Sequence, residues 1–202
     1  MKAQQIIYIV DDDETVLDAT GLLVKSMGFE VRAFRSAIEF LASYSPELRG
    51  CLILDVRMPE MSGIELQREL NERKFGMPII FITGHGDVPM AVEAMKHGAI
   101  DFLEKPYNDQ QLLDNINKAL ELDTLNFAKH EENAIVEKNL KKLTPREHEV
   151  MTRVVSGESN KVIAIELGLS ERTIEIHRSR VMSKMNCKSV AALVNLVSSV
   201  TS

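Results

Sequence analysis

The chain has 202 residues, of which 45% are apolar and 27% charged, as is typical of soluble globular proteins with one large or two small domains. Its two cysteines, Cys51 and Cys187, have neither the density of a disulfide framework nor the spacing of a metal site, so we expect both to be reduced in a cytoplasmic protein. Only five consecutive apolar residues precede the first aspartates, too few for a signal peptide or a membrane span. We therefore expect no membrane association.

The net charge of −6 is unevenly distributed. Residues 1–123 contain 12 basic and 21 acidic residues, a net charge of −9, whereas residues 124–202 contain 12 and 9, a net charge of +3. An acidic first half suits a cation or a basic protein surface, and a mildly basic second half suits phosphate backbones. Unevenly charged solvated surfaces are the commoner source of so small an asymmetry, so this pattern decides nothing alone.

Five short apolar runs in the first half alternate with segments of helical spacing. The alternation predicts an α/β domain over residues 1–122, with five parallel strands and crossover helices. Two helix starts, at residues 36–39 and 62–65, fit the capping box, in which a Ser hydroxyl and a Glu carboxylate satisfy backbone N–H groups. A further helix is predicted from Asp109 to at least Leu122. The predicted strands are 6–10, 31–34, 51–54, 78–82 and 99–103.

Four of these strands end in polar residues that parallel pairing would bring to one edge of the sheet. Asp55 alone could equally cap a turn, but it ends a buried run and precedes a Pro turn and a Ser-Gly helix start. Crowded carboxylates favour a bound cation, and Mg²⁺ prefers such oxygen ligands. A carboxylate can then attack phosphorus while an ammonium and a hydroxyl stabilise the phosphoryl oxygens. The residues expected at this edge are Asp11, Asp12, Asp13, Asp55, Thr83 and Lys105.

These motifs resemble the receiver domain of bacterial two-component response regulators. The resemblance covers residues 1 to about 122 and implies a flavodoxin-like sheet in which Asp55 accepts a phosphoryl group from a phosphohistidine of a sensor histidine kinase. It also implies that Asp12, Asp55 and the backbone carbonyl of Arg57 bind Mg²⁺, with Asp11 acting largely through water. The matching motifs are Val10-Asp-Asp-Asp13, Asp55-Val-Arg-Met-Pro59 with Gly63, Thr83-Gly-His-Gly86 and Phe102-Leu-Glu-Lys105-Pro106.

The same resemblance assigns roles to the ends of the fourth and fifth strands. Lys105 would pair with the phosphoryl group and form a cis peptide bond with Pro106. Thr83 and Phe102 match the switch pair of the family, in which the hydroxyl turns toward the phosphate and the aromatic ring moves inward. This movement would repack the surface of the fourth helix and fifth strand, about residues 87–103, for dimerisation.

We do not expect the chain to be an enzyme, beyond removing its own phosphoryl group. Arg57 and His85 lie where the family tunes that dephosphorylation. Residues 8–15 also fit the signature of haloacid-dehalogenase-type phosphatases, which would make Asp11 a nucleophile. Those enzymes need a later strand that ends in an acidic pair, for which the remaining sequence has no candidate, and the turn after Asp55 would be unexplained. The receiver interpretation is therefore favoured.

Residues 123–142 are charged and free of Gly and Pro, which predicts a helical linker that continues the preceding helix. The second domain, residues 143–202, begins with Thr144-Pro-Arg-Glu147, a capping box with Pro at the first helical position. Gly168 and Ser170 favour a tight turn between two helices, a helix-turn-helix signal that αα-hairpins without DNA also show. The predicted helices are 145–156, 160–167, 171–186 and 189–199.

Charge favours DNA binding by the predicted helix 171–186. Ile174, Val181 and Met185 form an apolar stripe, and residues 172–188 hold five basic side chains and one acidic. This density suits phosphate contacts beside a few side chains that reach base edges, although a solvated basic face is the alternative. The opposite arc of the helix contains Arg172, Glu175, Ile176, Ser179, Arg180 and Ser183.

The second domain closely resembles the LuxR-type four-helix DNA-binding domain, at residues 143–150, 160–164, 170–178 and 182–185. The resemblance implies that the third helix enters the major groove, where Glu175 could accept a hydrogen bond from cytosine N4. The helix over 189–199 would be a dimer contact, partly core. Together with residues 83–88, these motifs resemble the FixJ-type subgroup of the NarL/LuxR class. The residues expected to contact DNA are Lys161, Arg172, Thr173, Glu175, Ile176, Arg178, Ser179, Arg180 and Lys184.

The sequence therefore predicts a phosphorylation-controlled bacterial transcription regulator, with a receiver followed by an all-α helix-turn-helix domain. A histidine kinase would phosphorylate Asp55 with Mg²⁺ as cofactor, and the resulting homodimer would bind a two-fold related operator in double-stranded DNA. Activation, with a possible contact to RNA polymerase, is the expectation from the family. The alternative from another class is a receiver that acts as a phosphate sink or titrates a protein partner.

Overall fold

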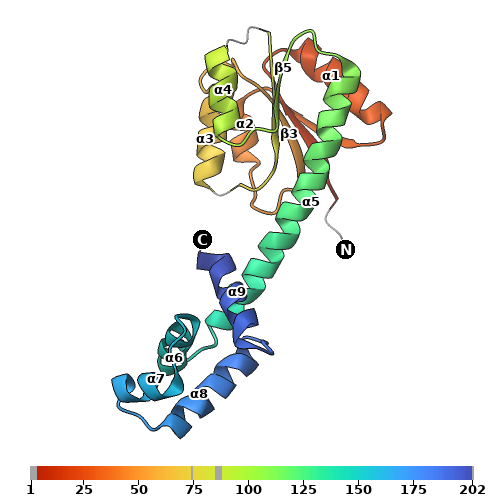
Figure 1. Cartoon of the computed structure of the whole chain (residues 1–202). Helices are drawn as coiled ribbons and strands as arrows, with labels where there is room; N and C mark the ends of the chain where they lie inside the picture. The colour runs from red at the N-terminus through yellow and green to blue at the C-terminus, as the bar shows by residue number, and fades with distance from the viewer. Residues whose placement is uncertain (1–3, 74, 85–87, 202) are drawn as a thin grey trace. The chain divides into compact units, whose positions relative to one another are not determined.

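The computed structural model describes residues 4–73, 75–84 and 88–201. The chain divides into two compact units, Met1–Phe127 and Ala128–Ser202, each with its own hydrophobic core (Figure 1). In the part of the chain that the structure describes, no helix combines the length and the apolar composition needed to cross a membrane.

The first unit is built on a five-stranded parallel sheet with the order β2-β1-β3-β4-β5. All residues of β1, β3 and β4 are buried, which explains why these strands are continuous apolar runs in the sequence. The strand order reverses direction between β1 and β3, the point at which sheets of this flavodoxin-like order bind ligands. The strands are β1 (Ile6–Val10), β2 (Glu30–Phe34), β3 (Gly50–Asp55), β4 (Ile79–Thr83) and β5 (Asp101–Glu104).

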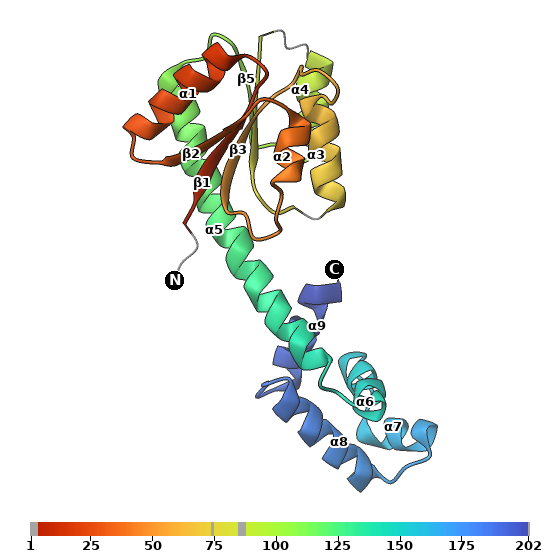
Figure 2. The same ribbon diagram turned by 180° about the vertical axis from the view of Figure 1, so that it is seen from behind.

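Helices cover both faces of this sheet, with α2, α3 and α4 on one face and α1 and α5 on the other (Figures 1 and 2). Tyr8 and Phe81 point into the hydrophobic cluster on one face of the sheet, and Ile7 and Ile82 point into the cluster on the other face, as the alternation of strand side chains requires. The predicted α/β fold is confirmed. The helices are α1 (Glu14–Ser26), α2 (Ala37–Ala42), α3 (Gly63–Glu72), α4 (Val88–Lys96) and α5 (Asp109–Leu140).

The predicted fifth strand begins two residues too early. The chain leaves α4 through Gly98, whose φ is 90°, and the N–H of Ala99 still donates to the carbonyl of Ala94 at 3.1 Å. Residue 99 therefore belongs to the turn that closes the C-terminal end of α4 and not to β5. The predicted cap of α3 is confirmed as a complete capping box. At α2 the Ser36 hydroxyl caps the helix as predicted, but the Glu39 carboxylate accepts from the N–H of Arg35 and not from that of Ser36, so the predicted box is incomplete.

Helix α5 is 32 residues long and includes most of the predicted linker. Its segment up to Phe127 is fixed to the first unit, where the carboxylate of Asp123 pairs with Arg49 at 2.9 Å and the Arg49 guanidinium lies 3.8 Å from the Phe127 ring centroid. Near its end, Val136 is buried in the core of the second unit. Leu125 and Ile135 are exposed, so the apolar residues of the linker divide between the core of the second unit and solvent.

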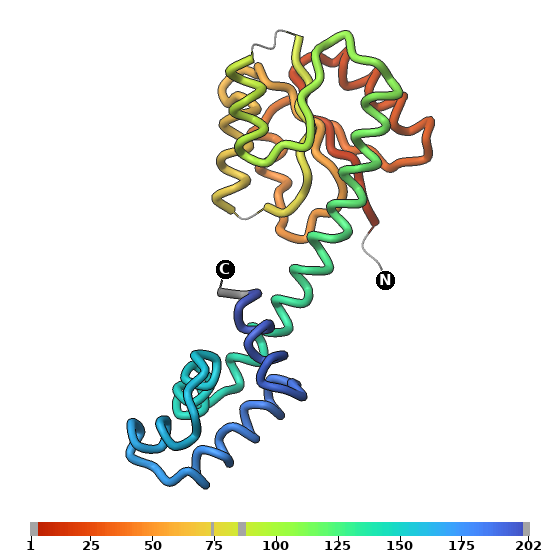
Figure 3. The backbone as a smooth tube through the Cα atoms, in the orientation of Figure 1, coloured from red at the N-terminus to blue at the C-terminus, as the bar shows by residue number. Residues whose placement is uncertain are grey.

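The second unit packs helices around Val150, Ile163, Ile174, Val181 and Leu193. Figure 3 traces its backbone. The turn before α8 is formed as predicted: the residue after α7 adopts a left-handed conformation, φ 65°, that glycine favours, and a serine hydroxyl caps α8. The all-α prediction is confirmed. The helices are α6 (Pro145–Val155), α7 (Asn160–Leu167), α8 (Glu171–Lys184) and α9 (Val190–Thr201).

Candidate functional site

The carboxyl ends of β1, β3 and β5 bring Asp11, Asp55 and Lys105 together. The ammonium of Lys105 donates to Asp11 Oδ2 at 2.6 Å and to Asp55 Oδ1 at 2.8 Å. Asp11 is 1% exposed and Asp55 is 5% exposed. Two buried carboxylates therefore share one cation, and with all three groups ionised the cluster has a surplus negative charge.

Backbone groups hold Asp55 in place at the end of β3. The N–H of Arg57 donates to Asp55 Oδ2 at 2.7 Å, and the N–H of Gly63 donates to the carbonyl of Val56 at 2.9 Å. A Cβ at Gly63 would lie 2.1 Å from the carbonyl oxygen of Asp55, so only glycine lets α3 start this close to the site. The glycine of the predicted Ser-Gly helix start thus has a steric reason.

The three consecutive aspartates after β1 have different environments. Asp11 Oδ1 accepts from the N–H of Asp13 at 2.9 Å, which orients its buried carboxylate. Asp12 is exposed. Asp13 is the N-cap of α1, where its side chain accepts from the N–H of Thr15 at 2.8 Å. Asp11 is thus the residue of the three that contacts Lys105, and Asp13 stabilises the following helix.

Burial changes the proton affinity of this cluster. It raises the pKa of the Asp11 carboxyl above its usual value, although the hydrogen bond from Lys105 opposes this effect. Burial alone would lower the pKa of the Lys105 ammonium, but its hydrogen bonds to Asp11 and Asp55 outweigh burial and raise that pKa. Lys105 is therefore charged at neutral pH, and a second cation would relieve the remaining repulsion.

The donor set fits a hard divalent cation. Within residues 4–73, 75–84 and 88–201, no three His, Cys, Asp or Glu side chains surround a common metal position. Mg²⁺ needs fewer protein ligands, since it binds one or two carboxylates and completes its octahedron with water and other oxygens. Asp11 and Asp55 supply two carboxylates with surplus charge, and Asp12 is adjacent in the chain. The backbone of Arg57, predicted to contribute its carbonyl, is held beside Asp55 by its N–H.

Of the two predicted switch residues, Thr83 adjoins this cluster and Phe102 packs against the hydrophobic core. Thr83 is 1% exposed at the end of β4, and its carbonyl accepts from the N–H of Lys105 at 2.7 Å. Phe102 is half-buried, with its ring centroid 6.2 Å from that of Phe81. The peptide bond between Lys105 and Pro106 is cis, as predicted.

The predicted dimerisation face, residues 87–103, is described from Val88 onward. Asp87 and His85, which was predicted to tune dephosphorylation, lie outside the described residues. Three apolar side chains of α4 are well exposed, namely Val88, Val92 and Met95. Helix α4 therefore presents apolar side chains to solvent on the predicted face.

Helix α8 divides into the two faces that its sequence predicts. Ile174, Val181 and Met185 are buried in the core of the second unit. The six residues of the predicted opposite arc are all exposed: Arg172, Glu175, Ile176, Ser179, Arg180 and Ser183. Lys161, which is on α7, is exposed as well.

Three of the residues that are expected to contact DNA form hydrogen bonds within the second unit. The Thr173 hydroxyl forms a hydrogen bond with that of Ser170 at 2.8 Å, and the Arg178 guanidinium donates to Asn160 Oδ1 at 2.8 Å. The Lys184 ammonium donates to Glu147 Oε2 at 2.6 Å. This bond and the N–H of Thr144 lower the pKa of the Glu147 carboxyl to about 2. The capping box in the sequence predicts the role of Glu147 at the start of α6, but no sequence pattern indicates its contact with α8.

Two family models match the chain. The response regulator receiver domain matches residues 7–117, and the bacterial regulatory proteins of the LuxR family match residues 141–197. The response regulator protein TodT of Pseudomonas putida is 46% identical over 191 residues, which cover 95% of this chain and 84% of TodT. The transcriptional regulatory protein FixJ of Rhizobium meliloti is 45% identical over 191 residues, which cover 94% of this chain and 93% of FixJ.

Solved structures agree with this result. A low-resolution structure of the response regulator StyR has a TM-score of 0.78 at 46% identity and covers 97% of this chain and 99% of StyR. Full-length FixJ from B. japonicum has a TM-score of 0.59 at 41% identity and covers 99% of this chain and 98% of that protein. Both relatives match this chain over nearly its whole length.

Proposed function

Because this chain belongs to the response regulators that combine a receiver domain with a LuxR-type DNA-binding domain, we propose that phosphorylation of Asp55 controls its binding to DNA. A sensor histidine kinase is the proposed phosphoryl donor, and the target is an operator in double-stranded DNA of the bacterial cytoplasm. The observation that carries this proposal is the buried cluster in which Asp11 and Asp55 share Lys105.

In the proposed reaction a carboxylate oxygen of Asp55 forms a bond to phosphorus. The P–N bond of the phosphohistidine breaks, and its electron pair stays on the imidazole nitrogen. Asp11, Asp12, Asp55 and the Arg57 carbonyl would hold Mg²⁺, which would supply neutralising charge for the phosphoryl oxygens. The Lys105 ammonium, which now donates to Asp55, moves its hydrogen bond to a phosphoryl oxygen, and the Thr83 hydroxyl donates to another.

The proposed output passes from this cluster to the surface of α4 and β5. When the Thr83 hydroxyl turns toward the phosphoryl group, Phe102 moves inward and the exposed apolar residues of α4 form a homodimer contact. A second contact between α9 helices then pairs two copies of α8 on a two-fold related operator. From the exposed face of α8, Glu175, Ile176 and Ser179 contact bases. The protein regulates transcription, and we expect it to activate through RNA polymerase.

Intact mass and sedimentation velocity test this proposal directly. With acetyl phosphate and Mg²⁺, the wild type is expected to gain one phosphoryl group and to shift from monomer to dimer. Asp55→Asn is expected to do neither. Asp13→Asn is the matched control, because Asp13 caps α1 and Asn also serves as an N-cap, so the adduct should persist.

A DNA-binding measurement separates regulation from a phosphate sink. Phosphorylated wild type is expected to bind duplexes selected from a random-sequence pool more tightly than the unphosphorylated protein does. An adduct with no change in DNA affinity would contradict DNA control and favour a receiver that only buffers phosphate. Turnover of a small phosphate ester that survives Asp55→Asn but not Asp11→Asn would instead favour an enzyme.

A further inference from the structure

Two basic side chains of α8 are fixed inside the second unit, on either side of its exposed face. We propose that Arg178 and Lys184 are positioning residues that hold α8 in the orientation that reads DNA, and that neither contacts a phosphate. This inference rests on the DNA-binding function proposed above, and it revises the sequence-based expectation for both residues.

Lys184 is tied to the start of α6. Its ammonium donates to Glu147 Oε2 at 2.6 Å and to the carbonyl of Lys142 at 3.0 Å. Glu147 is 2% exposed, and the same oxygen accepts from the N–H of Thr144 at 2.8 Å, which completes the capping box of α6. A move of Lys184 to a phosphate would leave a buried carboxylate without its cation, which is strongly unfavourable.

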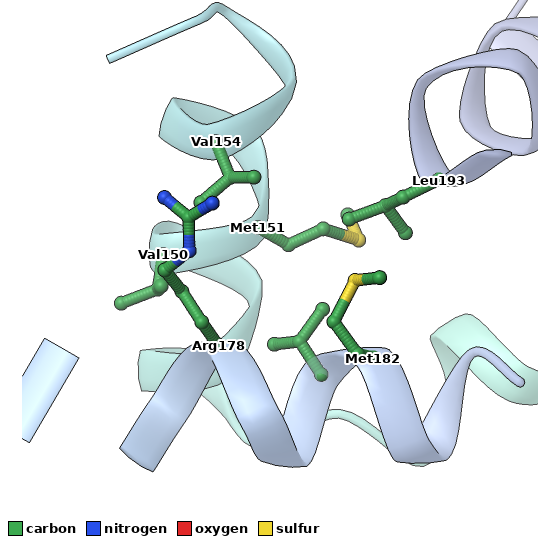
Figure 4. Close-up of a pocket in the computed structure, with 7 residues that line it drawn as sticks. Val150, Met151, Val154, Arg178, Met182 and Leu193 are labelled. Atoms are coloured by element: carbon green, nitrogen blue, oxygen red, sulfur yellow. The ribbon is translucent and has the colours of Figure 1, made fainter. Parts of the chain in front are cut away.

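Arg178 is tied to the start of α7. Its aliphatic stem lines a cavity of about 10 Å³ with apolar side chains of α6, including Val150, Met151 and Val154, as Figure 4 shows. This space holds one water at most, so the stem is part of the packed core. The guanidinium donates to Asn160, the first residue of α7, at 2.8 Å.

The two contacts flank the face that is available to DNA. With 3.6 residues per turn, each residue is rotated by about 100° from the previous one, so Arg178 and Lys184 lie on opposite edges of the arc centred near Ser179 and Ser183. An anchor on each edge, one to α7 and one to α6, fixes the rotation of α8 about its own axis. Base readout depends on that rotation, because a turn of the helix replaces the side chains that face the groove.

The test compares salt dependence with sequence selectivity in the full-length, phosphorylated protein. The probes are duplexes that the wild type selects from a random-sequence pool and a mixed-sequence duplex. Arg180→Gln, which removes an exposed charge, is expected to lower the affinity for the selected and the mixed-sequence duplexes by the same factor. It is also expected to reduce the slope of log affinity against log salt by about 0.9. Lys184→Gln and Arg178→Gln are expected to keep the wild-type slope and to lose about tenfold in affinity for the selected duplexes alone, the scale of one base contact.

Controls separate the anchor from the charge. Lys188→Gln removes the same charge from an exposed residue and is expected to keep wild-type selectivity. Glu147→Gln and Asn160→Ala break each anchor from the other side and are expected to reproduce the loss of selectivity without touching a basic residue. They also keep the test valid if Lys184→Gln or Arg178→Gln does not fold.

Three results would overturn the inference. A slope reduced by about 0.9 in Lys184→Gln or Arg178→Gln would identify that residue as a phosphate contact. Equal loss of selectivity in Lys188→Gln, or full selectivity in Glu147→Gln and Asn160→Ala, would show that the anchors do not orient α8. If the wild type binds neither probe, the proposed function fails together with this inference, whereas the other two results leave that function intact.

Discussion

Each unit of this protein contains a lysine whose ammonium donates a hydrogen bond to a buried carboxylate. The two clusters differ in the balance between positive and negative charge. In the first unit the ammonium of Lys105 donates to two carboxylates, those of Asp11 and Asp55, so the cluster has a surplus negative charge. Burial raises the pKa of the Asp11 carboxyl. In the second unit Lys184 pairs with a single carboxylate, that of Glu147, and this bond together with the N–H of Thr144 lowers the pKa of that carboxyl to about 2.

We infer that this difference in charge balance separates a reactive site from a structural one. An ion pair of one lysine and one carboxylate is stable as long as both partners are present, because loss of either partner leaves an uncompensated buried charge. A cluster with one carboxylate too many is stabilised by a further cation and can give up its lysine to a phosphoryl group. Four experiments test this comparison.

The largest effect is expected for Lys105→Met. This change removes the ammonium that we propose stabilises the phosphoryl oxygens, so phosphorylation by acetyl phosphate is expected to slow by about 10²- to 10³-fold, as measured by the rate at which the intact-mass adduct appears. Lys184→Gln is the matched control in the other cluster and should leave this rate unchanged. Similar slowing in both variants would contradict the division between reactive and structural clusters.

Asp123→Asn tests a third buried ion pair, which is balanced like that of Glu147. Asp123 and Arg49 are 4% and 11% exposed as side chains, so the loss of the carboxylate charge is expected to destabilise the first unit by about 3 kcal/mol in urea unfolding. Glu121→Gln, an exposed change on the same helix, should stay within about 0.5 kcal/mol of wild type. Changed Mg²⁺ affinity in Asp123→Asn would be evidence against a purely structural pair.

Glu147→Gln is expected to destabilise the second unit by about 2 kcal/mol at neutral pH, since a charge-assisted hydrogen bond is replaced by a weaker one. The pKa of Glu147 is lowered in the folded state, so its contribution is complete above pH 4.5, its usual value, and is lost as the pH falls through about 2. The difference between wild type and variant in hydrogen-exchange protection should shrink over that range. Glu149→Gln, which is exposed, should show no such trend.

The smallest effect concerns the pH dependence of Mg²⁺ affinity. The cation competes with a proton for Asp11, whose pKa is raised, so affinity measured by calorimetry is expected to fall by up to tenfold per pH unit below that pKa. Asp12→Asn should weaken binding but keep this pH profile. An affinity that stays flat down to pH 4 would mean that Asp11 titrates like an exposed carboxyl.

The sequence was sufficient to predict the fold of the first unit and the meeting of Asp11, Asp55 and Lys105, because both follow from chain order. Buried parallel strands appear as continuous apolar runs, and residues that follow such strands meet at one sheet edge. Asp11, Asp55 and Lys105 are therefore close in space although they are far apart in the chain. Which of the three consecutive aspartates faces inward depends on where β1 ends, and that detail required the structure.

The second unit shows where sequence patterns are insufficient. Basic residues on a helix are equally compatible with solvent, DNA and an internal carboxylate, and the contact of Lys184 with Glu147 depends on how α6 and α8 pack, which the sequence does not show. Sequence patterns are also insufficient for the linker, where the ion pair of Arg49 and Asp123 joins residues that are 74 positions apart in the chain. Its helix is largely polar, so periodicity predicted neither this contact nor the burial of Val136.

The most direct test of the contrast between the two clusters is a carboxyl titration by ¹³C NMR of the full-length protein, with and without Mg²⁺. We predict that Asp11 titrates above the usual aspartate pKa and that Mg²⁺ shifts its resonance, whereas Glu147 titrates near pH 2 and does not respond to the cation. If Glu147 titrates at its usual pKa, or if Mg²⁺ leaves Asp11 unaffected, the distinction between a reactive and a structural cluster is wrong.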